Sequence, residues 1–249
     1  MAQRARLQRR RRRTVTLVVV AALLALGAGA AFYFLLAQGQ HSTSSKPIIL
    51  YVNQGNGVVN ESNFGALSSF ATSHGFNTLF FQVYRQGVLL FTPTQLAHFV
   101  NQSHSSGLSI FFALYFTNSS QTLPASIYAV GEDGINLDMS TLPLPTQQGL
   151  LSSLQSAYHG ETAVTTTNLS SPLKPDLLIL ETYGAGLDQY IKPGVIASVG
   201  VFTTSSKQEY QSEFQYALQN SDGVMVFDYA GLLKSGYRTP LEAATATQS

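Results

Sequence analysis

The sequence contains no cysteine and no tryptophan, and only 11% of its 249 residues are charged. Without cysteine, disulfide bonds, thiolate metal sites and cysteine nucleophiles are all excluded. Acidic residues are absent from the first 60 positions, so all thirteen lie from Glu61 onward. The overall pI of 8.0 therefore averages two parts of opposite charge.

The N-terminal part combines a basic segment with a long uncharged one. Residues 1–13 carry seven arginines and no acid, and residues 14–37 contain no charge. At a rise of about 1.5 Å per residue, a helix over 14–37 would cross the hydrocarbon core of a bilayer, about 30 Å thick. We therefore predict a transmembrane helix there, with the lipid bilayer as its partner. A cleaved signal peptide is the alternative, because small residues at 27–31 could form a cleavage site, although its apolar region is usually only about 7–15 residues long.

Arginines beside a membrane span stay on the cytoplasmic side, so the remaining chain is expected outside, as in a single-pass cell-membrane protein. The predicted parts are a cytoplasmic basic segment (1–13), the span (14–37), a linker (38–46), a folded domain (47–235) and a flexible tail (236–249). Beyond the span there are seven basic and thirteen acidic residues, a net charge of about −6. No nucleic-acid partner is therefore expected. The sequence makes no prediction of an oligomeric state.

The outer part contains eight short apolar segments rich in β-branched and aromatic residues. They are Ile48–Asn53, Thr78–Tyr84, Leu108–Phe116, Gly134–Met139, Thr162–Thr167, Leu177–Tyr183, Val195–Phe202 and Gly223–Tyr229. Most are apolar at nearly every position, which is typical of parallel strands covered by helices. Segments with helical spacing lie between them, at Ser62–His74, Thr94–Ser105, Thr146–Tyr158 and Ser206–Gln219. Glycines that precede strands, at 75, 107, 160 and 223, are expected to end helices in the left-handed conformation.

Eight strands that alternate with helices predict an α/β fold, a compact (β/α)8 TIM-like barrel. The connections at 168–176 and 184–194 are too short for ordinary crossover helices. The runner-up is an open doubly wound sheet, which normally carries a glycine-rich phosphate loop after its first strand. The corresponding segment, Asn53–Gly57, matches that loop poorly.

In a barrel, catalytic residues gather at the C-terminal ends of the strands. Three carboxylates fall there, and we predict them as catalytic: Asp138, Glu181 and Asp228. Eight polar or aromatic residues at the same ends are predicted to bind substrate: Asn53, Gln82, Tyr84, Arg85, Tyr115, Asn136, Tyr183 and Tyr229. Paired carboxylates suit the cleavage of glycosidic bonds, one as acid and the other as nucleophile or base. Alternatively, these acids cap helices or pair with Arg85.

The histidines argue against other hydrolytic mechanisms. His74, His104 and His159 precede strands, and none of the five lies at a strand's C-terminal end. A histidine-bound metal or a Ser-His-Asp triad is therefore not expected, and no metal or cofactor is predicted.

Three segments resemble strands of glycosyl-hydrolase-like (β/α)8 barrels. Residues 76–87 (FNTLFFQVYRQG) resemble the second strand, where Gln-Val-Arg precedes the loop, although Tyr84 is inserted before Arg85. Residues 133–138 (DGINLD) resemble the fourth strand, whose last aspartate is often catalytic in that family. Residues 223–229 (GVMVFDY) resemble the closing strand. The resemblance implies a TIM-barrel glycoside hydrolase acting on a glycan.

The resemblance also assigns roles. Strand seven ends without an acid, so the arrangement is closer to that of α-galactosidase-type barrels, with the nucleophile on strand four and the acid on strand six. That would make Asp138 the nucleophile and Glu181 the acid. Polysaccharide-cleaving enzymes commonly stack sugars on tryptophan, which this sequence lacks. The alternative is therefore a non-catalytic barrel that acts as a carbohydrate-binding or cell-surface structural module.

Overall fold

The computed structural model describes residues 46–56, 59–168, 170–181, 191–201 and 206–235. The predicted membrane span, the basic segment before it and the tail after 235 lie outside these ranges. Within these ranges, no helix has the length and the apolar character needed to cross a bilayer.

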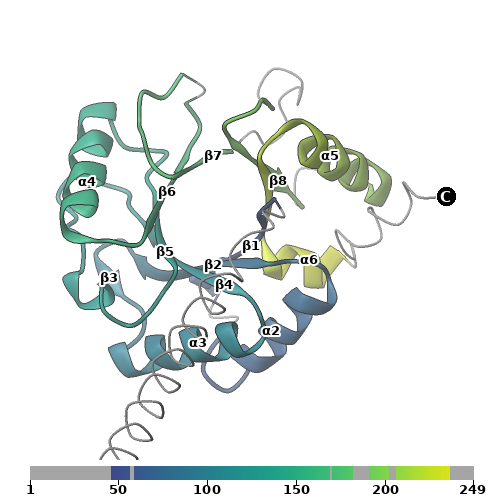
Figure 1. Cartoon of the computed structure of the whole chain (residues 1–249), viewed down its shortest axis with the longest axis horizontal. Coiled ribbons are helices and arrows are strands. Elements are labelled where there is room, and N and C mark those ends of the chain that lie inside the picture. The colour runs from purple at the N-terminus through teal and green to yellow at the C-terminus, as the bar shows by residue number, and fades with distance from the viewer. Residues whose placement is uncertain (1–45, 57–58, 169, 182–190, 202–205, 236–249) are drawn as a thin grey trace, which may run out of the picture. The chain divides into compact units, whose positions relative to one another are not determined.

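Eight parallel strands of the described residues close into a barrel (Figure 1). They are β1 (Ile48–Val52), β2 (Thr78–Arg85), β4 (Ser109–Tyr115), β5 (Gly134–Asp138), β6 (Glu161–Thr166), β7 (Leu177–Glu181), β8 (Ile196–Gly200) and β9 (Gly223–Phe227). The first strand pairs with both β2 and β9, which closes the ring and confirms the barrel over the open sheet. A two-residue strand, β3 (Val88–Leu89), was not predicted and pairs antiparallel with the end of β2.

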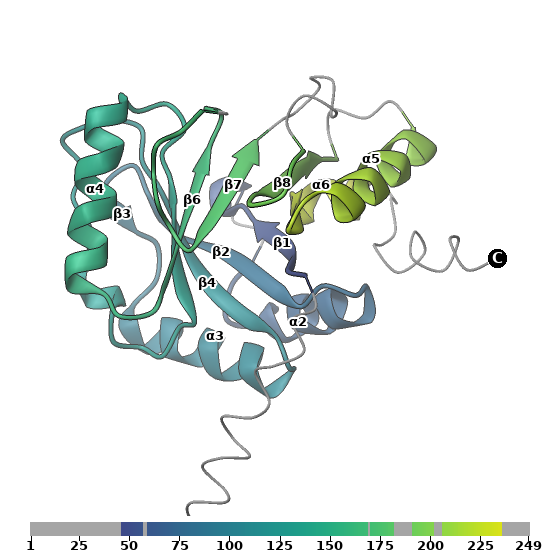
Figure 2. The ribbon, with the colours of Figure 1, turned by 45° about the horizontal axis from the view of Figure 1, so that its top comes forward.

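Helices lie along most of the outside of the barrel in both views, whereas the described residues between β6 and β7 form a loop (Figures 1 and 2). The four predicted helices are confirmed as α2 (Phe64–Ser73), α3 (Pro93–Ser105), α4 (Leu144–Ala157) and α5 (Lys207–Asn220). The α3 helix begins with a capping box, in which Thr92 and Gln95 bond each other's backbone N–H groups. A short helix, α6 (Tyr229–Ser235), directly follows β9 and was not predicted. Single turns of 3-10 helix lie at Gln54–Asn56 and Ala125–Ile127.

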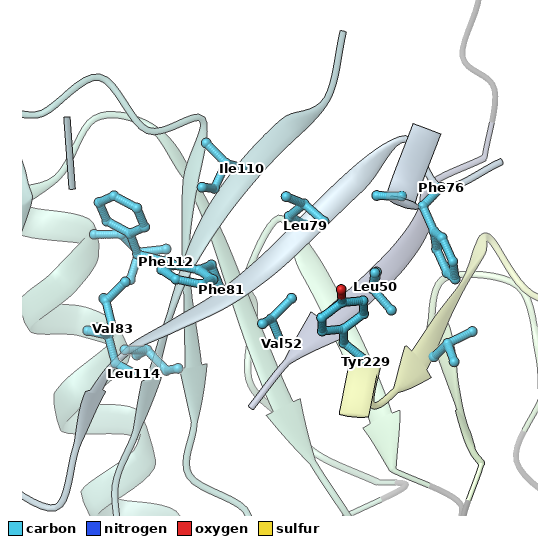
Figure 3. Close-up of a cluster of buried hydrophobic side chains, with 14 of the residues drawn as sticks. Leu50, Val52, Phe76, Leu79, Phe81, Val83, Ile110, Phe112, Leu114 and Tyr229 are labelled. Atoms are coloured by element: carbon cyan, nitrogen blue, oxygen red, sulfur yellow. The ribbon is translucent and has the colours of Figure 1, made fainter. Parts of the chain in front are cut away.

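The strands bury apolar side chains on both faces, which explains their nearly continuous apolar sequences. Alternate residues of β1 show the division, because Leu50 and Val52 belong to the core between strands and helices, whereas Ile49 and Tyr51 fill the barrel interior. Figure 3 shows outward-facing side chains of β1, β2 and β4 in the outer core. This alternation decides which strand-end residues can reach the mouth of the barrel.

The N-terminal ends of the strands carry a repeated contact. A residue directly before every second strand accepts a backbone N–H near the start of the preceding strand: Asn77 from Ile48 (2.9 Å), Asp133 from Ile110 (2.8 Å), Asp176 from Thr162 (2.7 Å) and Asp222 from Gly194 (3.0 Å). The contacts join β1 with β2, β4 with β5, β6 with β7, and β8 with β9. They satisfy N–H groups at this rim of the barrel that would otherwise need other partners.

The predicted left-handed glycines are only partly right. Gly75 and Gly107 have φ angles of 77° and 73°, as predicted, but Gly160 and Gly223 do not have positive φ. At Gly223 the requirement is space, because a Cβ atom there would lie 2.6 Å from the carbonyl oxygen of Pro47.

Candidate active site

A pocket of about 230 Å³ opens among residues at the C-terminal ends of the strands. It is lined by Tyr51, Asn53, Gln82, Arg85, Tyr115, Asp138, Ser140, Glu181 and Phe227. Six of these nine were predicted as site residues from the sequence, and they come from five different elements of the chain. The remaining three, Tyr51, Ser140 and Phe227, were not predicted.

The central group of the pocket is the buried carboxyl of Asp138, which ends β5. The hydroxyl of Tyr51 donates a hydrogen bond to its Oδ2 at 3.2 Å, while Oδ1 has no hydrogen-bond partner among the residues that the structure describes. Burial, followed by the negative charge of Glu181, raises the pKa of Asp138 to about 8, although the Tyr51 hydrogen bond lowers it. Protonation of Asp138 is therefore favoured well above the pH at which a free aspartate ionises.

Glu181 ends β7, two strands from β5 around the ring. Its charge acts directly on Asp138, which places the two carboxyls within electrostatic reach in one pocket. Two carboxyls so placed cannot both ionise freely, so the pair retains a proton to a higher pH than either would alone. This is the protonation state that acid–base cleavage of a glycosidic bond requires.

A β-bulge turns Arg85 into the pocket. On β2, Gln82 pairs with Ala113 and Tyr84 with Leu114, so Val83 is the extra residue in the ladder. Without this bulge, residues three apart would point to opposite faces of the strand. The bulge thus accommodates Tyr84, the residue inserted relative to the Gln-Val-Arg pattern. As a result, both Gln82 and Arg85 line the pocket.

The guanidinium group of Arg85 lies against the backbone of Gly55 and about 6.0 Å from the ring centre of Tyr115. In the described part of the chain, Arg85 forms no ion pair with Asp138 or Asp228, and it does not contribute to the shifted pKa of Asp138. The alternative in which Arg85 simply neutralises one of these acids is therefore not supported by the geometry.

Two amide side chains beside Arg85 have a defined orientation. Oε1 of Gln82 accepts the backbone N–H of Gln54 at 3.0 Å, and Oδ1 of Asn53 accepts that of Gly55 at 2.7 Å. Because a backbone N–H can only donate, the amide oxygens must face these groups. The NH2 groups of Asn53 and Gln82 are the ends left for a ligand.

Several predicted site residues lie elsewhere. Tyr84 is buried in the outer core and donates to the carbonyl of Thr122 at 3.0 Å. Asn136 is inside the barrel below the pocket, where its Oδ1 accepts the hydroxyl of Thr165 at 3.0 Å. Tyr229 belongs to the core outside the barrel (Figure 3), and its ring packs against that of Phe70. Tyr183 is outside the described residues.

Asp228 is also not among the residues that line the pocket. Its Oδ1 accepts the backbone N–H of Gly231 at 2.8 Å and so caps the N-terminus of α6. This is the capping alternative that the sequence left open. The short helix α6 was not predicted from the sequence. For that reason the position of Asp228 directly before a helix was not recognised.

The strand alternation could have found two of the missed residues. Tyr51 is two positions before Asn53 on β1, so it points to the same side of the strand. Phe227 shares a face with the interior residue Met225, and its ring centre lies 4.9 Å from that of Tyr51, with the two rings tilted by 39°. No cluster of three or more potential metal ligands occurs among the residues described.

The comparisons with known proteins identify the fold. The sequence matches no protein-family model, and no curated protein matches it. Among solved structures, it is similar to the GH18 chitinase ChiB of Flavobacterium johnsoniae, with 13% identity and a TM-score of 0.54 over 80% of this chain and 93% of that one. It is likewise similar to the GH113 β-mannanase AaManA of Alicyclobacillus acidocaldarius, with 11% identity and a TM-score of 0.53 over 80% and 90%.

A third similar structure is that of a xylanase and amylase inhibitor protein, XAIP-III, with 10% identity and a TM-score of 0.52 over 78% of this chain and 97% of that one. At these identities the likeness concerns the fold alone. The chain thus shares the TIM-barrel fold of glycoside hydrolases, and its function must be argued from its own pocket.

Proposed function

We propose that this chain is a glycoside hydrolase that cleaves glycosidic bonds with the carboxyl pair Asp138 and Glu181. The observation that carries the proposal is the pair itself. Two carboxyls share one pocket at the catalytic end of a TIM barrel, and the pKa of one is raised to about 8. Such a pair supplies both a proton donor and a carboxylate at neutral pH.

We assign the two roles differently from the family resemblance, on the basis of the raised pKa of Asp138. Asp138 holds the proton, so it acts as the general acid that protonates the leaving oxygen. Glu181 acts as the carboxylate that attacks the sugar or activates water. The resemblance implied the reverse roles.

The second candidate function is a non-catalytic barrel that binds carbohydrate. Two observations favour it: the sequence has no tryptophan for sugar stacking, and the fold is shared with an inhibitor protein. In that case the pocket would bind a sugar without cleaving it, and the wild-type protein would show no hydrolysis.

The test is hydrolysis by the purified full-length protein of a panel of aryl glycosides, chito-oligosaccharides and manno-oligosaccharides. Glu181→Gln and Asp138→Asn should each lower kcat by about 100- to 10,000-fold, the range of a lost acid or base. Asp176→Asn is the matched control, because Asp176 lies at the other end of the barrel. Hydrolysis that survives both pocket substitutions would reject the assignment. Binding without hydrolysis would favour the second candidate.

We also propose that a helix over residues 14–37 anchors the chain in the cell membrane, with the barrel outside. The uncharged length and the arginine run before it support this arrangement. Protease added to intact cells should digest the barrel domain but spare an N-terminal tag. A chain found in the soluble fraction, or a protected barrel, would contradict the proposal.

A further inference from the structure

The pocket has two chemically different sides. Its carboxyls, Asp138 and Glu181, come from β5 and β7, whereas Asn53, Gln82 and Arg85 come from β1 and β2. In the ring, β7 lies four strands from β2, which is halfway around an eight-stranded barrel, whereas β5 lies two strands from β2. The part of the pocket opposite Glu181 is therefore formed by amides and a guanidinium.

The polar groups that this second side offers to a ligand are mainly hydrogen-bond donors. The amide oxygens of Asn53 and Gln82 each already accept a backbone N–H group. Their NH2 groups have no acceptor within the described part of the protein. A guanidinium has five N–H donors and no acceptor. Three side chains thus offer donors to one region of the pocket.

Arg85 also has no direct ion pair among the described residues. Its guanidinium group instead lies against the ring of Tyr115 and the backbone of Gly55. Glycine at 55 leaves the space for the guanidinium, since a Cβ atom there would collide with it. A positive charge that a β-bulge directs into a pocket, without an ion-pair partner in the described part of the chain, is suited to an anion from the ligand.

We infer that the sugar bound in this pocket carries a carboxylate, as a hexuronic acid does, and that Arg85 binds it together with the amides of Asn53 and Gln82. This inference rests on the proposed hydrolase function. A planar carboxylate can accept two parallel hydrogen bonds from guanidinium, and the neighbouring NH2 groups supply further donors. The neutral sugar with CH2OH in the same place would leave the charge of Arg85 without a counterion.

The test compares substrates that differ only at this group. The full-length protein is assayed on the α- and β-anomers of 4-nitrophenyl glucuronide and 4-nitrophenyl glucoside. We expect kcat/KM to be about 10- to 100-fold higher for the glucuronide, the range of a charge-assisted hydrogen bond. In Arg85→Gln this ratio should fall toward one. Gln82→Glu, which keeps the acceptor for Gln54 but replaces the donor, should lower it as well. Lys174→Gln removes the same charge from an exposed position and should leave the ratio unchanged.

The outcomes separate the inference from the proposed function. Equal hydrolysis of both substrates, or a preference that persists in Arg85→Gln, overturns the inference while the hydrolase stands. If no substrate is hydrolysed, binding of D-glucuronate and D-glucose is compared by calorimetry. Glucuronate binding that is lost in Arg85→Gln supports the anion site without the reaction, and absent or equal binding of the two sugars overturns it.

Discussion

The two ends of the barrel use acidic residues in opposite ways. At the N-terminal ends of the strands, Asp133, Asp176 and Asp222 each accept a backbone N–H of a neighbouring strand or the residues before it. At the C-terminal ends, Asp138 accepts one hydroxyl at 3.2 Å and has an oxygen without a partner. These three aspartates complete the hydrogen bonding of the sheet, whereas Asp138 is left incomplete. Glu132, next to Asp133, is also buried, and its carboxyl oxygens have no hydrogen-bond partner among the described residues.

Hydrogen bonding and strand position together separate structural from functional carboxyls better than strand position alone, because Glu132 is also incomplete but does not line the candidate active site. A buried carboxyl without full hydrogen bonding destabilises the fold, so its retention calls for a function. Asp228 illustrates the value of the criterion. It follows a strand, as a catalytic residue would, but its oxygen accepts a backbone N–H and caps α6.

The largest effect is expected from the pH dependence of stability. Asp138 has a pKa of about 8 when folded and an ordinary value near 3.8 when unfolded. Between these values the folded state binds more protons, so stability falls as the pH rises from about 4 to about 8. Asp138→Asn should therefore be more stable than the wild type at pH 8, by more than about 1.4 kcal/mol, the equivalent of one pH unit. At pH 4 the two should be nearly equal.

Urea unfolding at pH 4, 6 and 8 measures this prediction. Some decline with pH should remain in the variant, because burial also raises the pKa of Glu132. A wild type and variant with parallel pH profiles would show that Asp138 is ionised in the folded protein, and the assigned role of general acid would fail.

The next largest effect concerns the opposite end. Asp176→Ala removes the acceptor of both the backbone N–H (2.7 Å) and the hydroxyl (2.9 Å) of Thr162. We expect a loss of about 1–3 kcal/mol in the free energy of unfolding, since donors near the start of β6 lose their partner. Asp176→Asn keeps an acceptor and should lose less. Glycoside hydrolysis by the folded fraction should be unchanged, and a loss as large as that of Asp138→Asn would erase the distinction between the ends.

Most of the fold could be predicted from the sequence. All eight strands and four of the helices appear within a few residues of their predicted positions, because apolar runs covered by helices are distinctive. The hairpin strand β3 and the helix α6 could not be predicted, since two and seven residues are too short for periodicity. The contacts at the N-terminal ends were also missed, because they join residues from 14 to 29 positions apart.

The candidate site was partly predictable for a similar reason. Strand ends identified Asp138, Glu181, Arg85, Gln82, Asn53 and Tyr115 as pocket residues. The direction of a side chain at a strand end, however, depends on the register. Because of the bulge at Val83, the side chain of Tyr84 points to the outer core and that of Arg85 to the pocket. The residue types in this segment do not predict a bulge. The raised pKa of Asp138 could not be predicted from the sequence either, because it depends on the burial of this carboxyl and on the charge of Glu181.

The smallest effect is expected at the hydrogen bond that distinguishes Asp138 from the acids at the other end. Tyr51→Phe removes the hydroxyl that lowers the pKa of Asp138, so this pKa should rise further and the alkaline limb of activity should move to higher pH. The loss in kcat/KM at neutral pH should be about 2- to 10-fold, the value of one hydrogen bond. Tyr115→Phe is the control, because Tyr115 lines the pocket without a hydrogen bond to Asp138. Loss of this donor favours the protonated form of Asp138. If the alkaline limb of the pH–activity profile instead moves to lower pH, the group that titrates there is Glu181. The roles of acid and base would then have to be exchanged between the two residues.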